Sequence, residues 1–383
     1  MKFLSKIHYK RFIPAVIFFS VLLISVIFIN KTPIPKTNVR NGVFYEKAVV
    51  TQIIKSELQL DELSGFQTGR QDVKVRIKSG EYKNREFETV NYASYSDNVT
   101  CKEGTRLIVS LHISGEATAV SIFTYDRTAP LIVLLIVFSL TLCVIGGKKG
   151  FKTLLSLVFT FVGIIYLFVP LLYIGVSPVL ASILLSAVSA AVTLCLIDGW
   201  NAKTISAIIG TVICVSLAGA LSSISAYFSN ISTFNIADMD EMIVVLNQSN
   251  LNIDGLLFSI ILIACLGAVM DICMSVSSTL NEIYINNPEM SKKSLFKAGM
   301  NVGKDMMGTM VNTLILAFAA GYLTSVIILS SHDITLYEIF SMPQIVSEII
   351  QGIAGSIGVF SAVPIVSFIS SRILIHKSPH RHC

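Results

Sequence analysis

Long uninterrupted runs of apolar residues recur along the chain and predict helices that span a membrane. Each run is close to the roughly 20 residues that a helix needs to cross about 30 Å of hydrocarbon. An outer-membrane barrel would instead show short strands of alternating polarity, so the pattern predicts a helical bundle. There are eight such runs: 12–29, 129–145, 154–174, 176–197, 205–228, 255–280, 306–329 and 349–371.

Residues 31–128, between the first and second runs, follow a different pattern in which polarity alternates at every second residue. Apolar Val73, Val75 and Ile77 are separated by basic residues, which puts the aliphatic side chains on one face of a strand. Five short strands in this region suit a small Greek-key barrel of the OB type, and the lack of an aromatic run favours a structural or partner-docking role. The other four runs cover 48–54, 85–90, 107–113 and 119–125.

The charges predict which parts of the chain are cytoplasmic. Charged residues make up only 14% of the chain, against 53% hydrophobic residues and a mean hydropathy of +0.72; soluble chains carry about 25% charged residues, which excludes a soluble enzyme. If the N-terminus is cytoplasmic, the cytoplasmic pieces hold 15 of the 29 Lys and Arg and the short external loops hold none, as the positive-inside rule requires. The net charge of +5 then needs no nucleic-acid partner.

These patterns divide the chain into four parts. Residues 1–30 are a basic cytoplasmic segment and a membrane helix, which we interpret as an uncleaved anchor because it is longer than the apolar core of a signal peptide. Residues 31–128 are an extracytoplasmic β domain, 129–373 a seven-helix transmembrane domain and 374–383 a cytoplasmic tail. The predicted fold is therefore a polytopic α-helical membrane protein of about eight spans, with a β-rich domain between the first two.

Polar side chains inside two of the spans are the candidate functional residues, because ionisable groups in a membrane helix are costly. Asp271 lies 16 residues after Gly255, about 24 Å along a helix that enters from outside. Spacings of three and four residues put each polar set on one helical face. The first set is Asp271, Ser275, Ser278 and Glu282, and the second is Asn301, Asp305, Thr309, Asn312 and Thr313.

The depths of these two sets match if the two helices are antiparallel neighbours. Asp271 then lies level with Asn312, and Ser275 lies level with Thr309, so we expect the two polar faces to meet across one interface. The hydroxyls alone would suit hydrogen bonds that join helices. A carboxylate is a costly way to join helices, so Asp271 favours a role in ion, proton or substrate passage.

Other chemistry finds little support in the sequence. Six of the seven cysteines lie inside predicted spans or at the terminus, and no C-x-x-C pattern occurs, so no disulfide, metal site or cofactor is predicted. No Ser-His pairing, H-E-x-x-H or P-loop is present. An intramembrane aspartyl protease would need Asp271 and Asp305 together, but their depths differ by about 10 Å. We therefore expect that the protein is not an enzyme.

Three sequence stretches, GAVMD from Gly267, SVSSTLNEIYINNPEMS from Ser275 and AGMNVGKDMMGTMVNTLILAFAAG from Ala298, resemble the signature region of the YibE/F-like family. The resemblance covers most of residues 40–372 and implies an N-terminal anchor, an exported region rich in strands and about seven membrane helices. Lys304 departs from the arginine that the family leads us to expect. The polar residues of both sets, with Gly303 and Gly308, fall on the family's motif positions. The family has no settled activity to carry over.

Two functions remain open. The first is a transporter or ion-coupled permease in a bacterial cell membrane, acting on an unknown small solute or ion and using the polar faces of the sixth and seventh spans. The alternative is a membrane scaffold or sensor whose exported β domain binds a protein partner. Under either function, the protein lies in the lipid bilayer and both termini are cytoplasmic.

Overall fold

The computed structural model describes residues 43–62, 65–95, 99–114, 117–231, 255–331 and 334–376. The chain divides into two compact units, one of Lys36–Thr141 and the other of Met1–Pro35 with Leu142–Cys383. We describe each unit by itself. The predicted anchor helix at 12–29, the predicted external loop residues 232–254 and the tail from residue 377 lie outside the described residues.

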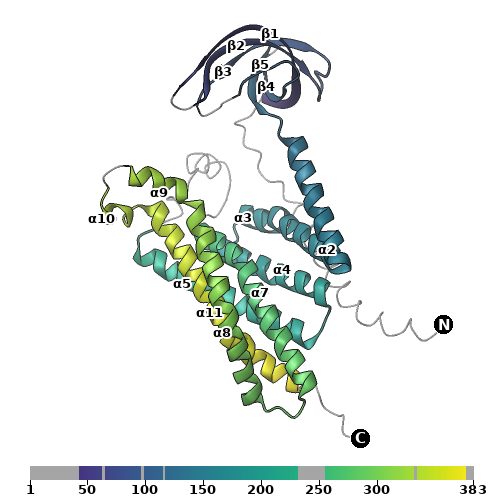
Figure 1. Ribbon diagram of the computed structural model, residues 1–383, viewed down its shortest axis with the longest axis vertical. Coiled ribbons are helices and arrows are strands. Elements are labelled where there is room, and N and C mark those ends of the chain that lie inside the picture. The colour runs from purple at the N-terminus through teal and green to yellow at the C-terminus, as the bar shows by residue number, and fades with distance from the viewer. Residues whose placement is uncertain are drawn as a thin grey trace, which may run out of the picture. The chain divides into compact units, whose positions relative to one another are not determined.

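Five antiparallel strands make up the first unit and form one curved sheet (Figure 1). The strand order is β3-β2-β1-β4-β5, and every predicted strand run is a strand here. The long first strand pairs with β4 through its first residues and with β2 through the rest, and two register shifts bend it so that the sheet curls into a half-barrel. The strands are β1 (Val43–Leu60), β2 (Gln67–Ile77), β3 (Glu86–Ala93), β4 (Arg106–Ser114) and β5 (Ala117–Tyr125).

The half-barrel buries the aliphatic side chains that the alternation predicted. Val73, Val75 and Ile77 of β2 are fully buried, and β4 contributes Leu107 and Val109 to the same core. Because neighbouring side chains on a strand point to opposite faces, the intervening basic residues lie outside the core. Burial of one face therefore sets the register of each strand.

One continuous helical stretch, Thr128–Tyr173, contains the second and third predicted spans. It comprises α2 (Thr128–Gly163), the π-helix η2 (Ile164–Phe168) and α3 (Val169–Tyr173). Gly147 interrupts α2 with φ 52° and ψ −132°, a conformation that side chains disfavour. A Cβ at Gly150 would overlap the backbone carbonyl of Leu142, so the chain folds back closely on itself around this break.

The rest of the second unit is built from α4 (Pro178–Asp198), α5 (Ala202–Phe228), α7 (Leu256–Asn286), α8 (Lys292–Gly321), α9 (Leu323–Ser330), α10 (Leu336–Ile339) and α11 (Pro343–His376). Among the described residues, five helices are long and apolar enough to cross a membrane, or six with the pair α8 and α9. That pair bends by 57° after Gly321, so the predicted span 306–329 is divided between two helices. The prediction of about eight spans is not confirmed.

Helices α5, α7, α8 and α11 pack together around one core (Figure 1). Glycine allows close approach at several crossings: a Cβ at Gly210 would overlap Val366, one at Gly219 would overlap Leu262, and one at Gly303 would overlap Val363. Small residues at helix crossings are typical of membrane bundles, in which packing rather than water exclusion holds helices together. The rotation of each helix therefore depends on these few contacts.

Candidate functional site

Helix α7 carries the first polar set on the side opposite its packed face. At 100° per residue, the four polar positions fall within about 60° of arc. The Asp271 side chain and that of Glu282 are exposed, and Ser275 and Ser278 are half-buried. The packed face of the same helix is formed by the fully buried Val269, Cys273, Val276 and Leu280, about half a turn away.

Helix α8 carries the second polar set, also on its exposed side. The helix begins at Lys292, where the Ser291 side chain accepts a hydrogen bond of 3.2 Å from the backbone N–H of Ser294, an ordinary N-cap. Its packed face is formed by Leu295, Gly299, Gly303, Val311 and Leu314. All five polar side chains are exposed: Asn301, Asp305, Thr309, Asn312 and Thr313.

The expectation that the two polar faces meet across an α7–α8 interface is therefore wrong. The two helices do contact one another, through Leu280 and Gly299, but these residues belong to the packed faces. The Thr309 and Thr313 hydroxyls donate within their own helix, to the carbonyls of Met306 and Thr309 at 2.9 Å. The matching depths of the two polar sets concern only the positions of the residues along the helix axes. The rotation of α8 about its own axis is set by the close packing of Gly299 and Gly303 against α11.

A polar cluster that the sequence did not indicate adjoins the α7 face. Lys203, near the start of α5, places its Nζ 3.4 Å from Asp198 Oδ1 and 3.5 Å from Ser278 Oγ. The Lys203 and Asp198 side chains are 18% and 20% exposed. The signal for this cluster in the sequence is the short spacing of Asp198 and Lys203 between two predicted spans.

Buried hydroxyls extend this cluster into the bundle. The Ser277 hydroxyl donates to the Lys203 carbonyl at 2.7 Å, and the Ser370 hydroxyl of α11 donates to Ser277 Oγ at 3.2 Å. Within the described part of the chain, the buried hydroxyls of Thr204 and Ser367 make no hydrogen bond. Buried polar groups are usually paired. The Thr204 and Ser367 hydroxyls can therefore accept or donate further hydrogen bonds in the part of the bundle that holds the Lys203–Asp198 ion pair.

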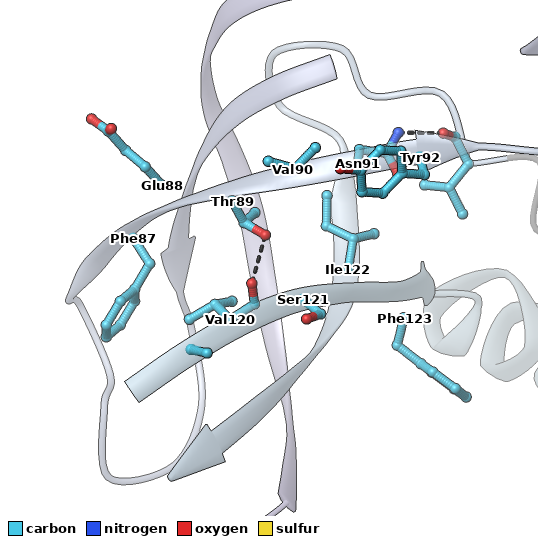
Figure 2. Close-up of a pocket in the computed structure, with 12 residues that line it drawn as sticks. Phe87, Glu88, Thr89, Val90, Asn91, Tyr92, Val120, Ser121, Ile122 and Phe123 are labelled. Atoms are coloured by element: carbon cyan, nitrogen blue, oxygen red, sulfur yellow. Dashed lines mark hydrogen bonds between the residues drawn. The ribbon is translucent and has the colours of Figure 1, made fainter. Parts of the chain in front are cut away.

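The half-barrel holds a second candidate site, a groove of about 590 Å³ between β3 and β5. These strands end the sheet on either side, and Figure 2 shows the Thr89 hydroxyl of β3 meeting the Val120 carbonyl of β5 at 2.6 Å. The groove is also lined by Tyr92 and Phe123, which are 68% and 55% exposed. Each of the two strands offers an edge that no sheet partner covers within the described residues.

Buried amides stabilise the chain beside this groove. The Asn91 side chain donates to the Val99 carbonyl at 2.6 Å and to Gln71 Oε1 at 3.2 Å. Gln71 in turn accepts from the Cys101 N–H at 2.9 Å and donates to the Cys101 carbonyl at 3.1 Å. Burial raises the pKa of the Cys101 thiol to about 11, which makes it a poor nucleophile.

Among the described residues, no group of three or more His, Cys, Asp or Glu side chains could hold a metal ion. Comparison with known proteins adds one finding. A family model described as YibE/F-like protein matches residues 134–376, which is more than half of the chain and runs from α2 to the end of α11. No curated protein and no solved structure matches the chain.

Proposed function

The chain belongs to the YibE/F-like family of membrane proteins, and on that premise we propose that it is a transporter or ion-coupled permease. One observation carries the proposal: Asp271 lies midway along α7, a helix apolar and long enough to cross a membrane, and its side chain is exposed. A charged side chain facing hydrocarbon costs roughly 3 kcal/mol on insertion scales. In a bilayer, Asp271 therefore faces water, an ion or a polar partner.

The polar groups along α7 supply a path toward one end of the bundle. From Asp271, a small solute or ion next meets the Ser275 and Ser278 hydroxyls and then the Lys203–Asp198 ion pair, whose ammonium already contacts Ser278. Asp271 changes protonation or ion occupancy in this scheme, and the hydroxyls replace water around the moving group. The scheme uses no enzymatic step and no cofactor.

The proposed topology places both termini in the cytoplasm and residues 31–128 outside it, in a bacterial cell membrane. Thr128–Tyr173 supplies two spans, one on each side of Gly147, and α8 with α9 supplies one bent span. With residues 12–29 as the anchor and single spans from α4, α5, α7 and α11, the total is eight. The positive-inside distribution of Lys and Arg supports this arrangement.

The proposal is tested by ligand-dependent stability. A ligand that binds only the folded state raises stability by mass action, so we would measure thermal unfolding of the detergent-purified chain from about pH 4 to about pH 9 against a panel of ions. We expect a shift in wild type that Asp271→Asn loses and that Glu88→Gln, a change of an exposed carboxylate in β3, keeps. Equal responses in all three proteins would contradict a binding role for Asp271.

The groove between β3 and β5 favours a second candidate function, in which the half-barrel binds a protein partner and the helices anchor it. Unpaired strand edges accept an extended peptide through main-chain hydrogen bonds. A photo-crosslinking residue at Tyr92 should then capture a partner in intact cells, and one at Phe66, an exposed aromatic outside the groove, should not. Capture at both positions, or at neither, would count against this function.

A further inference from the structure

A groove of about 510 Å³ lies at the end of the half-barrel where the chain passes from β5 into α2. Three cationic side chains line it: Lys47 of β1, Lys78 just after β2, and Arg106 at the start of β4. Asp126 contributes a carboxylate to the same lining. We call this site the basic groove. Three positive charges against one negative charge give its lining a net charge of +2.

The sheet itself holds these side chains together. The Lys78 N–H donates to the Lys47 carbonyl at 2.6 Å, and the Asp126 N–H donates to the Arg106 carbonyl at 3.0 Å. Arg106 pairs with Val49 across β1 and β4, and Lys47 lies two residues from Val49, so all three side chains lie on the same face of the sheet. The spacing of the charges is therefore set by strand pairing.

The positive charges of the basic groove are only partly neutralised. Lys47 Nζ lies 3.4 Å from Asp126 Oδ2, and Asp126 also accepts a hydrogen bond of 2.9 Å from the Thr128 N–H. The Lys78 and Arg106 side chains are exposed, and neither forms an ion pair or hydrogen bond with any residue that the structure describes. Two cations at one end of the sheet are thus available to an anion.

The basic groove lies close to the membrane surface along the chain. Asp126 precedes the apolar run 129–145 by three residues, which reach about 11 Å at most. Lipid headgroups extend about 5 to 8 Å beyond the hydrocarbon on each side of a bilayer. Residues 131–137 of α2 have exposed apolar side chains, as a helix in contact with lipid does. The long cationic side chains of the groove can therefore reach lipid phosphates.

We propose that the basic groove binds the phosphate of an anionic phospholipid in the adjoining leaflet. The guanidinium of Arg106 can donate two parallel hydrogen bonds to phosphate oxygens, and the Lys78 ammonium adds a second charge. A headgroup without an amine fits best, because the Asp126 carboxylate is already paired with Lys47 and bonded to Thr128. Phosphatidylglycerol has such a headgroup. This lipid site goes beyond the proposed transport function and does not depend on it.

The bilayer favours lipid over other anions, because it holds phosphates at the level of the basic groove at high local concentration. Free phosphate presents the same oxygens but is not concentrated there. Residues 232–254 contain four acidic residues, whereas residues 1–42 contain none. A groove filled by a carboxylate of the chain itself would not respond to the lipid composition, so one experiment separates these occupants.

The test measures backbone hydrogen exchange of the full chain in lipid nanodiscs. Discs of pure phosphatidylcholine are compared with discs that also contain phosphatidylglycerol, and exchange is followed in residues 77–79 and 102–106 at the basic groove. A ligand of the folded state suppresses local opening by the factor 1 + [L]/Kd, about ten-fold when the lipid is present at about ten times Kd. We expect slowing of that order in wild type when phosphatidylglycerol is present.

Two double variants locate the effect. Lys78→Gln with Arg106→Gln should lose the slowing. The matched control, Lys55→Gln with Arg70→Gln, removes two charges from exposed sites of β1 and β2 and should keep it, since Arg70 lies about 26 Å from Lys78 along β2. Slow exchange of the buried strand segment 73–77 in each variant checks that the half-barrel is folded.

Three results would overturn the proposal. Equal exchange of wild type in both kinds of disc would mean that no anionic lipid binds the basic groove, as expected if a carboxylate of the chain occupies it. Slowing that persists in a folded Lys78→Gln, Arg106→Gln variant would place the lipid elsewhere. Equal slowing by inorganic phosphate added to phosphatidylcholine discs would assign the groove to a soluble anion.

Discussion

The orientation of α8 can be tested by adding one methyl group to each of two glycines in the same helix. Gly303 faces Val363 of α11 so closely that a Cβ would overlap its side chain, whereas a Cβ at Gly308 would meet nothing within 4 Å. Alanine at either position gains the same helix propensity over glycine, about 1 kcal/mol. The difference between the two variants therefore isolates the packing contribution at Gly303.

Overpacking of this kind costs about 1 to 3 kcal/mol. We expect Gly303→Ala to be less stable than Gly308→Ala by that amount, with Gly308→Ala equal to wild type or slightly more stable. Unfolding would be followed by denaturing-detergent titration, at a high ratio of micelles to protein so that each chain is measured alone.

The order of stability of Gly303→Ala and Gly308→Ala decides which side of α8 is packed. If the polar side chains of α8 pointed into the bundle, as the sequence predicts, Gly308 would be packed and Gly303 exposed, and the order of the two stabilities would reverse. Equal stabilities would mean that α8 does not approach α11 as closely as Gly303 and Val363 require.

Three further predictions concern the half-barrel. Gln71→Leu leaves the Cys101 N–H and carbonyl without partners and should cost about 2 to 4 kcal/mol, seen as faster hydrogen exchange in β2. The Cys101 thiol, with a pKa of about 11, should react with maleimide far more slowly at neutral pH than a thiol introduced by Lys102→Cys, an exposed site. Hydrogen bonds from Thr128 lower the pKa of Asp126. The ionised Asp126 carboxylate therefore stabilises the fold above the unfolded-state pKa of about 3.9, and this stabilisation is lost as pH falls through the lower folded-state pKa. Asp126→Asn and wild type should differ in hydrogen-exchange rate at neutral pH and converge in acid.

The elements of this protein were largely predictable, because each follows from a local period. Alternation placed the five strands, and the three- and four-residue spacing put Asp271, Ser275 and Ser278 on one face of one helix. The bend after Gly321 was not predictable, since the apolar run continues through it without a proline. Residues 12–29, also predicted as a span, lie outside the described residues.

The rotation of α8 was not predictable for a physical reason. In water, the polar face of a helix turns outward because burying it costs free energy. In a membrane, an apolar side of a helix gains little from leaving the lipid, so packing contacts between residues distant in sequence take a large part in setting the rotation. Here the contacts of Gly299 and Gly303 with α11 decide it, and no spacing within α8 encodes them.

This rotation places the candidate residues on the outer sides of α7 and α8. The packed face of α8 is aliphatic or glycine, and that of α7 also holds cysteines and two buried serines. Carboxylates lie on the outer sides of both helices, and amides on that of α8. An Asp271 side chain facing hydrocarbon would carry the cost already given, so we expect it to face water, an ion or a polar partner in the membrane. Asn312→Leu removes an amide but no carboxylate, so the ion-dependent shift in stability that requires Asp271 should remain. If Asn312→Leu removed that shift, the amide of Asn312 would belong to the same ion site as Asp271.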